Sequence, residues 1–118
     1  MQNTHMANSF VTNLYPIPSG SANDHRLTVD ATVGGVQFSD SGKDDNTAAF
    51  DSLTKYIAMD VQDADVFMTF DGSAPTTSNG HKLFAGRSYT FSKEAAVKAK
   101  FIRSGGTSAK IHASQFTN

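Results

Sequence analysis

Residues 66–91, VFMTFDGSAPTTSNGHKLFAGRSYTF, decide the fold class of this chain. In the first five residues, Val66, Met68 and Phe70 alternate with Phe67 and Thr69, which is the period of a β-strand with two different faces. Asp71-Gly72 ends that strand, and Asn79-Gly80 and Ala85-Gly86 supply turn positions that tolerate a positive φ. The stretch therefore predicts strand, polar loop, short strand, turn and strand, as in a small antiparallel β-domain.

The same alternation recurs on both sides of this stretch. Ser92 followed by Lys-Glu-Ala-Ala predicts a single capped helical turn between two strands. Strands of about 8–12-residue spacing, about seven or eight in all, favour a sandwich of two sheets. We therefore expect an all-β fold, a single antiparallel Ig-like β-sandwich. Its further strands are predicted over 27–33 and 56–62, with a short strand or bulge over 36–38 and a hairpin of 97–102 and 109–116 closed by 104–107.

Composition limits the classes of protein to which the chain can belong. Its 118 residues suit one domain, and the absence of cysteine excludes disulfides and thiolate chemistry. A formal charge of −1 gives no strong attraction to nucleic acid or to an anionic membrane. The first ten residues, MQNTHMANSF, lack the basic and apolar regions of a secretory signal, so release or assembly without classical export is expected.

The N-terminal region differs from the rest of the chain. Residues 1–9 are small and polar and predict a flexible arm. Pro16 and Pro18 favour an extended edge segment over a central strand. We therefore divide the chain into an arm and edge segment, 1–26, and a β-sandwich domain, 27–118. The apolar anchors that the first part offers to a partner are Phe10, Leu14, Tyr15 and Ile17.

Metal-ligand patterns are weak in this sequence. No pair of histidines has helical spacing, so neither a catalytic nor a structural metal is expected. His81 is expected to donate to a loop carbonyl, and His112 to lie exposed on its strand. The acidic loop 39–47 has oxygen ligands of the kind that calcium uses, but Lys43 interrupts it and the order of residues is not that of an EF-hand. The four histidines are His5, His25, His81 and His112.

The acidic side chains are expected to serve turns. Asp44 and Asn46 are predicted to cap a local turn within the loop 39–47. Asp71 is predicted to form an Asx-turn, because a catalytic role would need a second carboxylate whose position the sequence does not reveal. No GxSxG motif or phosphate loop is present. We therefore predict a protein without catalytic residues or a cofactor, and not an enzyme.

Residues 60–103 resemble a class of small proteins encoded among the virion-structure genes of tailed bacteriophages. The resemblance rests on five features, which in this chain are Phe70-Asp71-Gly72, Pro75-Thr76, Asn79-Gly80-His81, Ala85-Gly86, and Phe101-Ile102-Arg103 with Gly105-Gly106. A looser similarity joins the DGSxPT turn to the Ig-like accessory domains of chitobiase-type glycoside hydrolases, which bears on fold more than on function.

The phage resemblance implies a non-enzymatic virion protein. A capsid decoration or cement protein is the leading expectation, with the major capsid protein and further copies of the chain, as a dimer or trimer, for partners. The expected contact residues are the apolar anchors named above together with Asp44, Asp45, Thr76, Thr77 and His81. The alternatives are a head–tail connector or tail protein, and a carbohydrate-binding module that would use Tyr56 and Tyr89.

Overall fold

A computed structural model of the chain describes residues 14–17, 24–46 and 48–118. In these residues eight β-strands and one short helix form two antiparallel sheets, which confirms the expected all-β sandwich-like fold. The strands and the helix in chain order are β1 Tyr15–Pro16, β2 Asp24–Val29, β3 Tyr56–Gln62, β4 Val66–Thr69, β5 His81–Leu83, β6 Ser88–Ser92, α2 Lys93–Lys98, β7 Lys100–Arg103 and β8 Ala109–Thr117.

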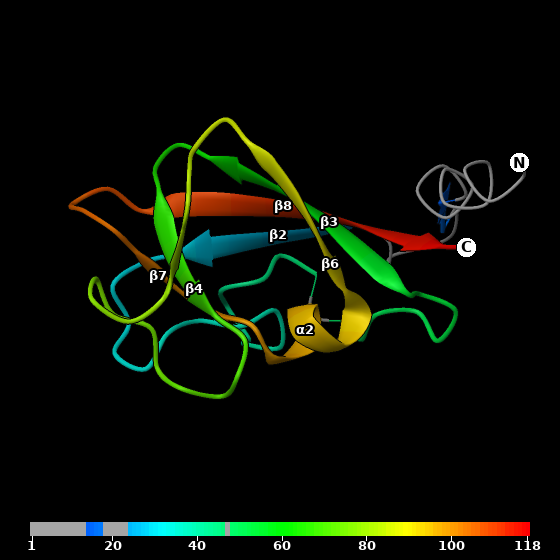
Figure 1. The fold of residues 1–118 in the computed structure, drawn as a ribbon, viewed down its shortest axis with the longest axis horizontal. Coiled ribbons are helices and arrows are strands. Elements are labelled where there is room, and N and C mark those ends of the chain that lie inside the picture. The colour runs from blue at the N-terminus through cyan, green and yellow to red at the C-terminus, as the bar shows by residue number, and fades with distance from the viewer. Residues whose placement is uncertain (1–13, 18–23, 47) are drawn as a thin grey trace, which may run out of the picture.

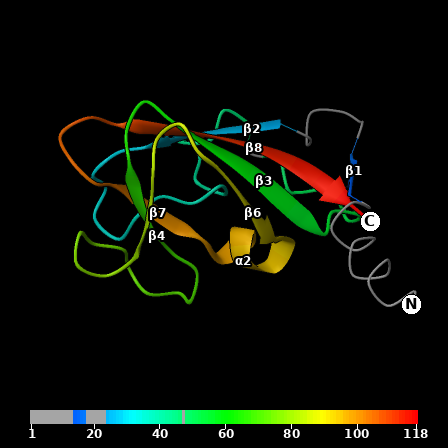
Figure 2. The same cartoon turned by 45° about the horizontal axis from the view of Figure 1, so that its top comes forward.

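Strand β8 is the centre of the larger, five-stranded sheet (Figures 1 and 2). β3 pairs with one edge of β8 over seven residues, from Tyr56 to Gln62. β2 pairs with the other edge, and β1 continues that edge with the pairs Tyr15–Thr117 and Pro16–Phe116. β6 adds to the outer edge of β3. The edge position of β1 agrees with the prediction made from Pro16 and Pro18, because proline has no amide hydrogen to donate and is tolerated at the edge of a sheet.

The smaller sheet has the order β5-β4-β7. In both views it lies beside the half of the larger sheet that is farther from the C-terminus, and α2 lies between β6 and β7. The two sheets enclose one core of side chains from alternate strand positions, and burial of each such side chain stabilises the fold by roughly 1.5–3 kcal/mol. Its most buried large members are Leu27, Ile57, Met59, Met68, Phe101 and Ile111.

The stretch 66–91 forms its elements in the predicted order. β4 buries Val66 and Met68, and Thr69, at its end, donates its hydroxyl to the Ser73 carbonyl at 2.6 Å. In β6, Tyr89 and Phe91 lie on the inner side and pack against the core, as the alternation predicts. The sequence therefore identifies every strand of this central region.

The predicted capped turn is helix α2. The Ser92 hydroxyl accepts a hydrogen bond from the Ala95 amide at 3.2 Å, which satisfies one of the free amide groups of the first turn. Glu94 lies in the first turn and Lys98 in the last, as the helix dipole favours. Ala96 is buried against the core. The helix is six residues long and includes Val97, which the sequence assigned to a strand.

The strand predicted over 27–33 is shorter than expected and begins earlier. β2 starts at Asp24 and ends at Val29, because the Asp30 carboxylate accepts hydrogen bonds from the Thr32 amide and hydroxyl and closes a turn. Val33 is therefore 96% exposed. At Gly35 the φ is +85° and a Cβ atom would meet Pro75 at 2.8 Å, so glycine is required there.

The predicted hairpin of 97–102 and 109–116 is wrong. β7 pairs with β4 in the smaller sheet, whereas β8 pairs with β2 and β3 in the larger one. The connection between them crosses from one sheet to the other, and the Ser104 amide donates to the Asp65 carbonyl at 3.1 Å. The physical reason is that Phe101 and Ile111 are both fully buried and enter the core from opposite sheets.

The N-terminal division is less sharp than the sequence implies. β1 is hydrogen-bonded to the larger sheet, Ile17 is 4% exposed, and its amide donates to the Gln115 carbonyl at 2.9 Å. β2 begins three residues before the expected boundary at residue 27. The predicted arm, residues 1–9, and Phe10 lie outside the described residues. Within the described ranges, no helix is long and apolar enough to cross a membrane.

Gln115 joins an irregular loop to the centre of the larger sheet. Its side chain is fully buried at the inner face of β8. The side-chain oxygen accepts hydrogen bonds from the Asp51 amide and from the Thr54 hydroxyl, both at 2.7 Å. This one amide group therefore fixes the loop that leads into β3.

We expect the substitution Gln115→Ala to lower the free energy of unfolding by about 1–3 kcal/mol, because it leaves the part-buried Asp51 amide and the buried Thr54 hydroxyl without their acceptor. Urea denaturation followed by circular dichroism measures the change. Ser114→Ala, at the exposed neighbouring position of the same strand, is the matched control and is expected to change stability by less than about 0.5 kcal/mol. Equal effects of the two substitutions would contradict this role of Gln115.

Candidate functional site

A buried histidine–aspartate pair connects β2 to the acidic loop. His25 is the second residue of β2 and, like Leu27 and Val29, points to the inner side of the sheet. The free edge of β2 is bound by the loop, since the Thr28 amide donates to the Lys43 carbonyl at 2.7 Å and the Asp45 amide to the Arg26 carbonyl at 3.0 Å. This pairing carries Asp44 inward to His25.

The pair has a defined geometry. Nδ1 of His25 lies 2.5 Å from Oδ2 of Asp44, and the two side chains are 1% and 0% exposed. The other Asp44 oxygen accepts the Asn46 amide at 2.9 Å, and the Asn46 side chain accepts the Ala48 amide at 3.1 Å. The predicted capping role of Asp44 and Asn46 is therefore confirmed, and the pairing of Asp44 with His25 is additional to it.

Aromatic rings surround the imidazole. Phe50 meets it edge to face at a centroid distance of 4.7 Å, and Phe38 does so at 5.9 Å. Phe38 also contacts Phe50 and, from the core, Phe101. Within the described part of the chain, Nε2 of His25 is buried and has no hydrogen-bond partner. A buried polar atom of this kind costs roughly 1–3 kcal/mol, so it is a feature that calls for an explanation.

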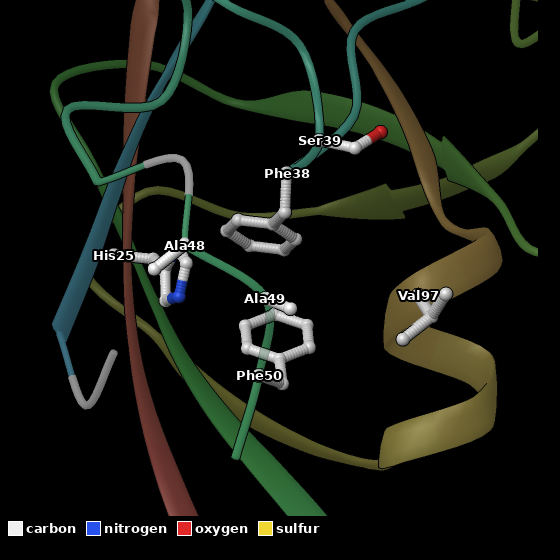
Figure 3. Close-up of a pocket in the computed structure, with 7 residues that line it drawn as sticks. All are labelled: His25, Phe38, Ser39, Ala48, Ala49, Phe50 and Val97. Carbon is white, nitrogen blue, oxygen red and sulfur yellow. The ribbon is translucent and has the colours of Figure 1, made fainter. Parts of the chain in front are cut away.

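A cleft of about 250 Å³ lies beside these rings (Figure 3). His25, Phe38 and Phe50 line one side of the cleft, and Val97 of α2, which is 51% exposed, lines the other. Ser39, Ala48 and Ala49 complete the lining. The cleft is therefore mainly apolar, and its one buried polar side chain is a histidine whose orientation is fixed by a carboxylate.

The remaining acids of the loop 39–47 have partners within the protein. Asp40 accepts the Gln37 amide at 2.8 Å, and Asp45 pairs with Arg26 at 3.1 Å on the surface. Lys43 pairs with Asp30. Among the described residues no group of three histidine or acidic side chains is arranged as a metal site. The carboxylate oxygens of Asp40, Asp44 and Asp45 therefore already serve hydrogen bonds within the protein.

The loop 72–80 is held by its own side chains. The Asp71 carboxylate accepts the Ser73 hydroxyl at 2.6 Å and the Ser73 amide at 3.0 Å, which confirms the Asx-turn. These bonds, the hydroxyl first, lower the pKa of Asp71. Asn79 donates its side-chain amide to the Ala74 carbonyl at 3.1 Å, and the Thr76 amide donates to the Asn79 carbonyl at 3.0 Å. The loop is therefore a defined surface feature.

Two of the expected contact residues in this region are exposed, namely Thr76 and Thr77. His81 is also exposed, but its ring stacks on Phe70 at a centroid distance of 5.5 Å and an interplanar angle of 12°, in place of the expected bond to a loop carbonyl. His112 is 38% exposed and pairs with Asp24, so its predicted outward position is confirmed.

The other expected contact residues are divided by burial. Tyr15 is 57% exposed, Leu14 is half-buried and Asp45 is exposed, so the side chains of these residues remain available to a partner. Ile17 and Asp44 are each only 4% exposed. This corrects the expectation that both side chains are displayed, because Ile17 is buried where its backbone pairs with Gln115 of β8, and Asp44 is held by His25.

Tyr56 and Tyr89, the aromatic residues considered for sugar binding, lie on opposite faces of the larger sheet. Tyr89 is paired with the buried Met59, whereas Tyr56 is three residues from Met59 on β3 and points outward. The Tyr89 hydroxyl also accepts the Phe84 amide at 3.0 Å. The two rings therefore do not form one platform.

The importance of His25 is not apparent from histidine spacing alone. The available signal is its parity, since it lies two and four residues before the inward-pointing Leu27 and Val29 on the same strand. The partner Asp44 is 19 residues away in the sequence, and only the pairing of the loop with the edge of β2 brings the two together. Alternation extended to residue 25 would have identified the buried histidine, but not its acid.

No family model, curated protein or solved structure matches this chain. The evidence for a function therefore lies in the geometry of the described residues and in the motifs of the sequence.

We expect Asp44→Asn to lower the free energy of unfolding by about 1–3 kcal/mol, because the buried imidazole loses its charged hydrogen-bond partner. The matched control is Asp45→Asn, which removes a carboxylate that is 49% exposed and pairs with Arg26, whose side chain is 53% exposed. Such surface pairs contribute at most about 1 kcal/mol. Thermal and urea unfolding of both variants measure the difference, and a larger loss in the Asp45 variant would contradict the assignment.

The lowered pKa of Asp30 predicts that the free energy of unfolding depends on pH. Hydrogen bonds from Lys43 and then from Thr32 hold the pKa of Asp30 well below its ordinary value. A carboxyl with a lowered pKa in the folded state adds stability that is complete above its unfolded pKa of about 3.9 and is lost as the pH falls towards the folded value. The stability difference between wild type and Asp30→Asn should therefore shrink from about pH 6 to about pH 2. Urea midpoints across this range measure it, and a constant difference would exclude the linkage.

Proposed function

We propose that this chain is a non-enzymatic structural protein of a tailed-phage virion, and that it binds the outer surface of the capsid as a decoration or cement protein. The proposal joins the sequence resemblance over residues 60–103 to the sandwich-like fold. The proposed partners are the major capsid protein and further copies of this chain. Neither nucleic acid nor a membrane is a partner in this proposal.

The main support for the proposal is that the motif residues Asp71 and Asn79 stabilise their own loop. Asp71 and Asn79 form bonds within their own loop, at 2.6 Å to the Ser73 hydroxyl and at 3.1 Å to the Ala74 carbonyl. Among the described residues, neither side chain is bonded to a second carboxylate. The motif therefore builds a fixed loop that displays Thr76 and Thr77, and exposed loops held by a rigid scaffold are a common location of contact residues.

The placement of the two candidate contact regions also supports a role between neighbouring subunits. β1, with the exposed Tyr15, lies beside the C-terminus, whereas the loop that follows β4 lies at the other end of the domain (Figure 2). Surfaces at opposite ends contact two different neighbours more readily than one. Such an arrangement suits a protein that joins neighbouring capsid subunits.

The copy number of the protein in particles tests this proposal. Purified virions of the phage that encodes the chain are digested, and the chain is quantified by mass spectrometry against the major capsid protein. We expect a ratio near one to one, because a lattice protein is repeated with each capsid subunit. A ratio of a few per cent would replace the capsid role with the head–tail or tail alternative. Absence from the particles would overturn the virion proposal.

A further inference from the structure

We propose that the cleft beside His25 is a binding site for a phenol-type group, an aromatic ring that carries one hydrogen-bond donor. The ring would lie among Phe38, Phe50 and Val97, and its donor would bond to Nε2 of His25. This inference is independent of the proposed virion role, because it rests on the cleft and on one unpartnered atom.

The bond between Asp44 and His25 determines which nitrogen of the imidazole carries the proton. A carboxylate accepts hydrogen bonds and does not donate them, so the contact of 2.5 Å with Nδ1 places the histidine proton on that nitrogen. In the neutral ring Nε2 then presents a lone pair, which requires a donor. Within the described residues Nε2 has no partner although the residue is fully buried. A hydroxyl or ring N–H group from outside supplies what the protein lacks.

The lining of the cleft is mainly apolar and suits an aromatic ring. Two phenylalanine rings stand edge to face against the imidazole, which is the arrangement in which a further aromatic ring packs well. The volume of about 250 Å³ is below the range of about 300–1,000 Å³ usual for drug-sized ligands. An apolar cavity of about 150 Å³ already holds a benzene ring. The space therefore suits a single ring.

Access to the site comes from the surface of α2 and from the loop 48–50. Val97 is half-exposed on the helix, and Ala48 and Ala49 are exposed in a segment without regular secondary structure. Nε2 is itself buried in the structure, and the partly buried Phe50 ring stands edge to face against the imidazole. We therefore expect binding to require movement of a lining side chain, for which Phe50, in a segment without regular secondary structure, is the candidate.

The same chemistry is available from a tyrosine side chain of a partner protein or from a free small phenol. The test uses p-cresol, which is the tyrosine side chain, and toluene, which has the same shape without the hydroxyl. The full-length protein is titrated with each and followed by NMR, including the ¹⁵N resonance of His25 Nε2. A parallel titration with N-acetyl-tyrosinamide separates the two sources, because a partner's tyrosine carries a backbone at that position.

We expect p-cresol to bind about 10-fold or more tightly than toluene, because the hydroxyl pairs a buried acceptor that toluene leaves unpaired. The Nε2 resonance should move on addition of p-cresol. Binding of N-acetyl-tyrosinamide as well would identify a partner side chain as the occupant, and binding of p-cresol alone would identify a small molecule. Equal binding of toluene and p-cresol, or an Nε2 resonance that does not move, would overturn the proposal in favour of a bound water or an empty cleft.

Two surface variants keep the test independent of folding. Val97→Trp fills the cleft from the exposed side of α2 and should abolish p-cresol binding. Leu53→Trp places the same side chain at a position that is 67% exposed and does not line the cleft, and it should leave binding unchanged. Undiminished binding in the Val97 variant would place the ligand elsewhere and overturn the assignment of this cleft.

Discussion

β8 forms backbone hydrogen bonds along both of its edges, to β3 on one side and to β2 and β1 on the other, and the other elements are positioned relative to this strand. Its inward residues Ile111 and Ala113 are fully buried in the core, and Gln115 continues the same row. Because a shift of one residue would turn this row outward, the buried face fixes the register of all three partners. One polar residue in the row, Gln115, then ties the loop before β3 to the sheet.

The long connection between β2 and β3 completes the sandwich without forming a strand of its own. Its residues 43–45 bind the free edge of β2, and Val36 exchanges two backbone hydrogen bonds with Phe101 at the edge of β7. One edge of each sheet, that of β2 and that of β7, is thereby covered, which protects these two edges from pairing with other chains. The same connection provides Asp44, which bonds to His25, and it provides Phe38 and Phe50, which line the cleft. The segment that covers these edges therefore also forms part of the cleft.

Polar side chains in this protein mostly serve the backbone or each other. Asp30, Asp40 and Asp71 each accept a nearby amide and close a turn. His25 differs from them, since one ring nitrogen is tightly held while the other is buried without a partner among the described residues. A fixed acceptor beside three aromatic or aliphatic walls is the arrangement that favours a ligand, whereas the closed turns favour a rigid surface.

Alternation and turn residues predict the fold class and most strands, because they are local properties that act within a few positions. VFMTF and its following turns, the capped helix after Ser92 and the strand over 56–62 all follow from such local rules. The assignment of β7 and β8 to different sheets is not local, since their alternation is the same whether they pair with each other or with β4 and β3. The pairing of the strands also determines the position of the His25–Asp44 site. The contact of His25 with Asp44 depends on which edge of β2 is left free after β8 has paired with the other, and no local pattern encodes that choice.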